Sequence, residues 1–149
     1  MLKRDITFQI SLWNGLCMGA GSGMTWRSPI RIATNNSVYA IPETRVGFIA
    51  DTGGACFFTH GASEQSQARQ DISLGLYLGL TGTRVVGRDL VKWGLATHFV
   101  DESQLSELYS RITNGVTKET TSAEIDAIVS SVCQADPAGE GEIENLAEI

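Results

Sequence analysis

Proline and histidine are scarce in this 149-residue sequence, and each scarcity excludes a class of protein. Three prolines beside sixteen glycines exclude a proline-rich linker protein. His60 and His98 have no carboxylate or thiol ligands at metal-binding spacing, so we expect no metal site. Only 19% of the residues are charged and 42% are hydrophobic, which excludes a disordered regulator and predicts a buried core.

Cysteines are few, and long apolar runs are missing. Cys17, Cys56 and Cys133 form no CxxC pair, and their odd number does not suit a secreted disulfide framework. We therefore expect an intracellular, reducing compartment, with the cysteines as small core residues. No apolar run is long enough to cross a bilayer, so no membrane partner is expected.

Positive charge is lacking in the last third of the chain. Residues 1–100 hold nine Lys and Arg against six Asp and Glu, whereas residues 101–149 hold two against eleven. A mildly basic body is compatible with a phosphate-bearing ligand, but there is no basic stripe with interleaved aromatics. The distribution argues against nucleic acid as a partner.

The apolar pattern predicts an α/β protein. Alternation predicts a strand at 6–13, with one apolar face. Apolar stretches predict short strands at 30–34 and 38–41, and a strand or an extended turn at 95–100. Helical spacing predicts helices at 72–80 and 88–93, followed by two amphipathic helices near the C-terminus. Leu105, Leu108, Tyr109 and Ile112 form the apolar face of the first of these, and Thr121 with Glu124 is placed as a capping box for the second.

Two features could carry chemistry. The turn Gly19-Ala20-Gly21-Ser22-Gly23 follows a strand and opens a helix, where free N–H groups can bind a phosphate or a developing oxyanion. The same glycines could instead serve close packing of helix on strand. The pair Glu43 and Asp51 could divide acid and base roles, or Glu43 could cap a helix or pair with Arg45.

Four separated segments resemble, in order, blocks of the enoyl-coenzyme A hydratase/isomerase (crotonase) superfamily, and most closely its 3-hydroxyisobutyryl-coenzyme A hydrolase branch. They are NGLCMGAGSG at 14–23, PETRVGFIADTGG at 42–54, LTGTR at 80–84 and GLATHFV at 94–100. The resemblance covers roughly residues 10–105. It implies part of a crotonase-like spiral of ββα units, followed by the amphipathic C-terminal helices.

The resemblance also implies roles for individual residues. Ala20 matches the position, usually glycine, whose backbone N–H binds the thioester oxyanion, with Gly19 and Gly21 beside the substrate. Glu43 and Asp51 match the two acids of the hydrolase: Glu43 attacks the thioester or deprotonates a water that does, and Asp51 binds the substrate hydroxyl or assists proton transfer. Gly23 stands where hydratases carry a catalytic glutamate, which favours hydrolysis. Coenzyme A is then part of the substrate, and no separate cofactor is expected.

The superfamily's other oxyanion segment has no counterpart before residue 10, so the chain is expected to be a fragment of an acyl-coenzyme A thioester hydrolase. Two alternatives stay open: a catalytically incomplete subunit with a structural role, and another hydrolase or isomerase of the superfamily. The expected partners are the acyl-coenzyme A substrate and either a second copy or a partner chain that covers the truncated core. A mitochondrial location follows from the resemblance if the source is a eukaryote.

The sequence divides into three expected parts. Residues 6–105 form the partial crotonase-like core, 106–133 a helical segment, and 134–149 an acidic flexible tail. The polar stretch 59–71 is longer than the family's connection at this point and is interpreted as an insertion or an altered splice boundary.

Overall fold

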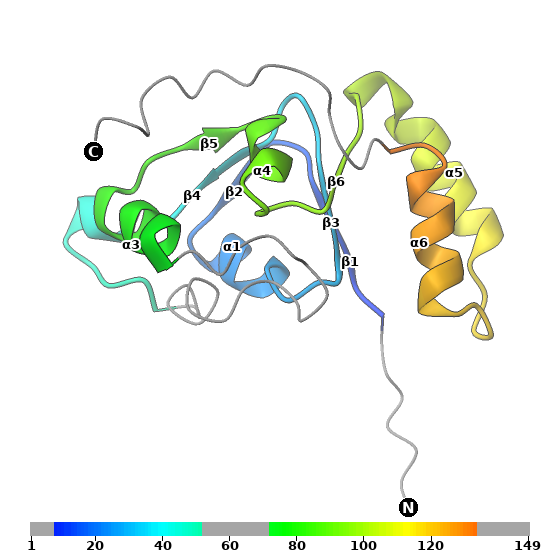
Figure 1. Cartoon of the computed structure of the whole chain (residues 1–149), viewed down its shortest axis with the longest axis horizontal. Coiled ribbons are helices and arrows are strands. Elements are labelled where there is room, and N and C mark those ends of the chain that lie inside the picture. Colours follow the sequence, from blue (N-terminus) through cyan, green and yellow to red (C-terminus); the bar gives the residue numbers. More distant parts are fainter. Residues whose placement is uncertain (1–7, 52–71, 134–149) are drawn as a thin grey trace, which may run out of the picture.

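The computed structural model describes residues 8–51 and 72–133, which form short strands surrounded by helices (Figure 1). The expected insertion at 59–71 and the acidic tail at 134–149 lie outside the described residues, as do Cys56 and His60. The strands are β1 (Ile10–Trp13), β2 (Leu16–Met18), β3 (Ile30–Ala33), β4 (Val38–Ala40), β5 (Val85–Val86) and β6 (His98–Phe99). The helices are α1 (Ala20–Thr25), α3 (Ile72–Thr81), α4 (Asp89–Lys92), α5 (Leu105–Gly115) and α6 (Ser122–Ser130), with 3-10 turns η1 (Glu43–Val46) and η2 (Glu102–Gln104).

The strands form two small sheets, in which most neighbouring strands are parallel. One has the order β1-β3-β6 and the other β2-β4-β5, with only the β4–β5 pair antiparallel. The chain passes from the first sheet to the second twice, at Asn14-Gly15 and again at residues 34–37. Ser37 secures the second passage, because its hydroxyl donates to the Trp13 carbonyl and accepts from the Thr34 N–H. The predicted strands near 30 and 38 are confirmed, but β2 was not predicted.

Strand β1 corrects the expectation of a single apolar face. Its Ile10 and Leu12 are partly buried against the second of two clusters described below, but Ser11 and Trp13 on the opposite face are more deeply buried. Ser11 can be buried because its hydroxyl shares a hydrogen bond with that of Ser28 (2.5 Å). The polar residue Ser11 of the alternating pattern is therefore an interior residue whose hydrogen-bonding capacity is satisfied by Ser28.

Two hydrophobic clusters lie on opposite faces of the β1-β3-β6 sheet. Successive side chains of a strand point to opposite faces, and β3 accordingly places Ile32 in one cluster and Ala33 in the other. The first cluster joins the strands to α1, α3 and α4; its members include Trp13, Cys17, Trp26, Tyr39, Leu78, Leu90 and Phe99. The second joins β1 and β3 to α5 and α6; its members include Ile30, Val100, Leu105, Leu108, Ile125, Val129 and Cys133.

The helices follow their sequence signals closely. Thr121 and Glu124 form the predicted capping box at the start of α6, with the Glu124 carboxylate accepting from the Thr121 N–H (2.8 Å). Leu105 and Leu108 of α5 are buried, but Tyr109 is 57% exposed, so its place on the buried face was wrong. The boundary proposed at residue 105 falls at the first residue of α5, and the division into parts remains a prediction. Within the described segments, no helix is long and apolar enough to cross a membrane.

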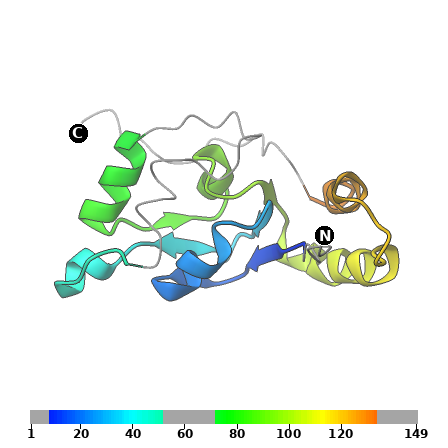
Figure 2. The same cartoon turned by 90° about the horizontal axis from the view of Figure 1, so that it is seen from below.

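Figure 1 and Figure 2 show how these helices are distributed around the strands. The pair α5 and α6 stands at one end of the molecule, while α3 and η1 stand at the other. Helix α1 lies between these ends, directly after β2. The glycine turn and Glu43 are therefore held by the part of the molecule that contains the first cluster.

His98 on β6 connects the sheet to α6. Its Nδ1 is hydrogen-bonded to the Thr97 hydroxyl (2.9 Å) and its Nε2 to the Ser130 hydroxyl (3.1 Å), with an Asp126 carboxylate oxygen 3.7 Å from Nε2. Burial lowers the pKa of His98 below 6.5; Arg31 lowers it further, while Asp126 opposes the shift. His98 is therefore a buried, hydrogen-bonded residue of the core.

Acid should destabilise the fold through His98. Because its pKa is lower in the folded chain than in the unfolded chain, its contribution to stability is complete above pH 6.5 and declines as the pH falls below that value. The urea midpoint should therefore fall between pH 7.5 and 5.5, and it should fall less in His98→Gln. Equal losses in the two proteins would contradict this assignment. The carboxylates with lowered pKa, Asp101 and Glu124, titrate below this window and affect both proteins equally.

Candidate functional site

The glycine turn adopts a backbone that only glycine favours. Gly19 has φ 53° and ψ −127°, immediately before the first residue of α1. A Cβ on Gly19 would meet only the Glu43 Oε1 atom, at 3.6 Å, and one on Gly21 would meet nothing within 4 Å. Close packing of helix on strand, the alternative interpretation of these two glycines, is therefore not observed.

This turn leaves backbone donors free. The Gly23 N–H bonds to the Gly19 carbonyl (3.1 Å), and no side chain caps the start of α1. Among the residues that the structure describes, the N–H groups of Ala20 and Gly21 have no acceptor. Ala20 is itself exposed, so its methyl group does not need a space in the core. Two unpaired N–H groups on an exposed turn are the groups that an oxyanion requires.

Glu43 lies beside this turn. Its Oε1 is the atom nearest to the missing side chain of Gly19, and its Oε2 is buried without a hydrogen-bond partner within the described segments. Residue 43 follows Pro42 and opens η1, where the Glu43 carbonyl accepts from the Phe48 N–H (2.9 Å). A buried carboxylate oxygen without a partner is costly for a fold and marks a candidate for chemistry.

Arg45 orients η1 without neutralising Glu43. Its Nε donates to the Thr81 carbonyl at the end of α3 (2.9 Å), and its side chain also lies against Gly82, where a Cβ would approach it to 3.1 Å. No ion pair joins Arg45 to Glu43, although the structure describes both residues. The alternative of a structural pair between them is therefore not observed, and Arg45 attaches the segment that carries Glu43 to α3.

Ser22 of the glycine turn and Tyr39 of β4 are joined by a hydrogen bond, and the sequence pattern predicted a role for neither of them. The Ser22 hydroxyl donates to the Gly19 carbonyl (2.7 Å), and Tyr39 on β4 is hydrogen-bonded to Ser22. Burial, above all, raises the pKa of Tyr39, and nearby Cys17 and Glu43 raise it further, while Ser22 and Arg31 oppose the shift. Only one sequence signal pointed here: Ser22 is the single polar side chain within the glycine turn.

Cys17 and Asp51 are placed differently from Glu43. Burial raises the pKa of the Cys17 thiol, which is hydrogen-bonded to Thr25, so Cys17 is a core residue and not a nucleophile. Asp51 is exposed and is the last residue before the segment that the structure leaves undescribed. It makes no hydrogen bond or ion pair to residues 8–50 or 72–133. The structure thus brings Glu43 to the glycine turn, whereas no bond joins Asp51 to that turn within the described segments.

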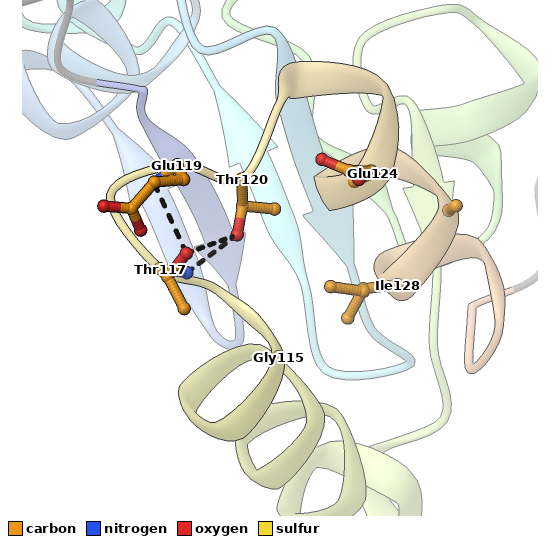
Figure 3. Close-up of a pocket in the computed structure, with 7 residues that line it drawn as sticks. Gly115, Thr117, Glu119, Thr120, Glu124 and Ile128 are labelled. Atoms are coloured by element: carbon orange, nitrogen blue, oxygen red, sulfur yellow. Dashed lines mark hydrogen bonds between the residues drawn. The ribbon is translucent and has the colours of Figure 1, made fainter.

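A surface pocket lies elsewhere, where α5 turns into α6 (Figure 3). It is lined by Gly115, Thr117, Glu119, Thr120, Glu124, Ala127 and Ile128. Several polar groups there bond to their neighbours: the Thr120 hydroxyl accepts from the Thr117 N–H (2.8 Å), and Glu124 belongs to the capping box. The pocket is open, and it is separate from the residues of the glycine turn. Across 8–51 and 72–133, no group of three or more potential metal ligands occurs.

Comparison with known proteins places this arrangement in a family. The chain is 38% identical over 104 residues to the mitochondrial 3-hydroxyisobutyryl-CoA hydrolase of Dictyostelium discoideum, covering 70% of this chain and 25% of that protein. It is 40% identical over 100 residues to 3-hydroxyisobutyryl-CoA hydrolase 1 of Arabidopsis thaliana, covering 67% and 24%. The chain thus spans about a quarter of the curated relatives it matches.

Solved structures agree on the fold. A carnitinyl-CoA dehydratase from Mycobacterium thermoresistibile superposes with a TM-score of 0.67 at 26% identity, covering 89% of this chain and 34% of that one. An enoyl-CoA hydratase/isomerase from Marinobacter aquaeolei superposes at 0.60 with 22% identity, covering 83% and 44%. The expected crotonase-like α/β fold is confirmed. Because a sequence profile of the enoyl-CoA hydratase/isomerase family also matches residues 3–149, the chain belongs to that family.

Proposed function

We propose that this chain takes part in the hydrolysis of an acyl-coenzyme A thioester, with 3-hydroxyisobutyryl-coenzyme A as the substrate. The observation that carries the proposal is the position of Glu43: one carboxylate oxygen faces Gly19 and the other is buried without a partner. The acyl group is suggested by the curated relatives, which are named 3-hydroxyisobutyryl-CoA hydrolases.

In the proposed reaction, the Ala20 N–H donates to the thioester oxygen as negative charge develops there. Glu43 then acts in one of two ways. Its carboxylate attacks the carbonyl carbon, coenzyme A leaves as the thiolate, and water hydrolyses the resulting mixed anhydride. Alternatively, Glu43 takes a proton from a water molecule whose oxygen attacks the same carbon, and coenzyme A again leaves as the thiolate. Asp51 is proposed to bind the substrate hydroxyl or to assist proton transfer.

Hydrolysis is preferred to hydration for a reason of side-chain chemistry. Adding water across a carbon–carbon double bond requires both a base and an acid near the acyl chain. Gly23, which by resemblance stands at the position of a hydratase glutamate, supplies neither. Coenzyme A is part of the substrate in this scheme, and the proposed reaction uses no separate cofactor.

We also propose a cellular location for the chain. Relatives from animals and Dictyostelium are named mitochondrial, and we propose that location here if the source is a eukaryote.

Several apolar side chains in η1, in the segment that follows it and in α3 are exposed; these are Val46, Phe48, Ile49, Leu76 and Leu80. A second copy or a partner chain is proposed to cover them. Residues 6–105 are proposed as the core, followed by the helical segment 106–133 and the tail 134–149.

The test is a direct assay of the purified chain. With 3-hydroxyisobutyryl-coenzyme A, we expect release of free coenzyme A thiol; with crotonyl-coenzyme A, we expect no hydration. Hydration without thiol release would favour a hydratase or isomerase. Failure of both reactions would favour a catalytically incomplete subunit. A single turnover in H₂¹⁸O tests for the covalent route: ¹⁸O in the Glu43 carboxylate shows that a mixed anhydride formed and that water opened it at the Glu43 carboxyl carbon, which the general-base route cannot do.

A further inference from the structure

The Gly19 carbonyl is held from two sides. It accepts a hydrogen bond from the Ser22 hydroxyl (2.7 Å) and another from the Gly23 N–H (3.1 Å). The second bond belongs to the helix and would form with any residue at 23 except proline. The first depends on the serine side chain, which is 6% exposed and has its Oγ directed back at the start of its own helix.

That carbonyl belongs to the peptide group whose N–H is the proposed oxyanion donor. A peptide group is planar and trans, so the Gly19 C=O and the Ala20 N–H point in opposite directions along one rigid unit. Fixing the oxygen therefore fixes the direction of the N–H. A hydrogen bond received by the oxygen also polarises the group and makes its N–H a stronger donor.

The need for such a restraint follows from the backbone at Gly19. Glycine populates conformations of both signs of φ readily, so φ 53° is one accessible state among several for this residue. Rotation about the bonds of Gly19 would turn the Gly19–Ala20 peptide and direct its N–H away from the substrate. The Ser22 hydroxyl opposes that rotation from the carbonyl side.

Ser22 is itself anchored to the sheet. Its side chain is also hydrogen-bonded to Tyr39, which is 2% exposed on β4. A hydrogen-bonded connection thus runs from a buried strand residue, through Ser22, to the peptide that faces solvent at Ala20.

We propose that Ser22 is a positioning residue, which orients the Gly19–Ala20 peptide so that its N–H meets the thioester oxyanion. The inference rests on the proposed function for its consequence in catalysis. Tyr39 has a lesser part, since it acts on the Ser22 side chain.

The test compares Ser22→Ala with a matched change one turn further along α1. The Thr25 hydroxyl also donates to a helix carbonyl, that of Gly21 (2.8 Å), but this carbonyl belongs to a different peptide group. Ser22→Ala is expected to lower kcat about tenfold with KM changed less than about twofold, short of the roughly 10²–10³ lost with a whole donor. Ser22→Thr, which keeps the hydroxyl, should restore most of the rate, and Thr25→Val should leave kcat unchanged.

A second measurement does not depend on turnover. In ¹H–¹⁵N spectra, the Ala20 amide resonance should shift in Ser22→Ala and keep its position in Thr25→Val, while thermal unfolding shows that both variants are folded. An unmoved Ala20 amide, or an equal loss of kcat in the two variants, would overturn the role of Ser22. If even the unmodified chain releases no thiol while the Ala20 amide still responds to Ser22→Ala, the proposed function falls and the orientation of this peptide by Ser22 stands.

Discussion

Replacing Glu43 with Gln is expected to abolish thioester hydrolysis while the chain stays folded. Glutamine keeps the size of the side chain but can neither attack a carbonyl nor take a proton. If Glu43 acts as a general base, the loss in kcat should be about 10²–10⁴. If it is the covalent nucleophile, the loss should approach about 10⁶. The measurement is thiol release under saturating substrate.

Stability provides a separate expectation for the same variant. Glu43 Oε2 is buried without a partner, so removing the charge removes a desolvation cost, and the unfolding temperature should be unchanged or higher. Glu102→Gln is the matched control, because Glu102 also opens a 3-10 turn but is exposed on η2, away from the glycine turn. Unchanged turnover in Glu43→Gln would remove Glu43 from the mechanism.

Ala20→Pro is expected to remove the oxyanion donor while preserving the helix. Ala20 is the first residue of α1, a position where proline is well tolerated because the N–H there has no helical partner. The substitution deletes that N–H without replacing a side chain of the core. Turnover should fall by about 10²–10³, as in other enzymes that lose one oxyanion donor.

The control for Ala20→Pro is the same change at the start of another helix. Ser122 is the first residue of α6, and Ser122→Pro should leave turnover unchanged. Unfolding temperatures of both variants should lie close to that of the parent chain. A fully active Ala20→Pro protein would show that the oxyanion is bound by other groups.

Local patterns predicted the helices and the position of the glycine turn well. The capping box at Thr121 depends on neighbours close in sequence, and it was found as predicted. Tyr109 shows the limit of periodicity, because helical spacing alone cannot say how far a partner surface extends around α5.

Long-range features could not be predicted in the same way. The passage of the chain between two sheets depends on Ser37 reaching Trp13 across 24 positions, which no local pattern encodes. Likewise, the alternating pattern predicted Ser11 on the solvent-facing side of its strand, whereas its hydroxyl is hydrogen-bonded to Ser28 in the interior. At the site, the motif resemblance singled out Glu43 and Ala20, whereas Ser22 and Tyr39 gain significance only from the hydrogen bond that joins a turn to a strand.

The two clusters on opposite faces of β3 give different meanings to sequence variation in this protein. A substitution among the buried residues of α5 and α6 weakens packing on the face away from the glycine turn. A loss of about 1–2 kcal/mol there changes how much folded protein a cell keeps by several-fold, because unfolded chains are degraded. A substitution near Gly19 or Glu43 instead changes what each folded molecule does. Substitutions on the α5–α6 side of strand β3 should therefore alter abundance, whereas those that alter specific activity should lie on the other side, around the glycine turn.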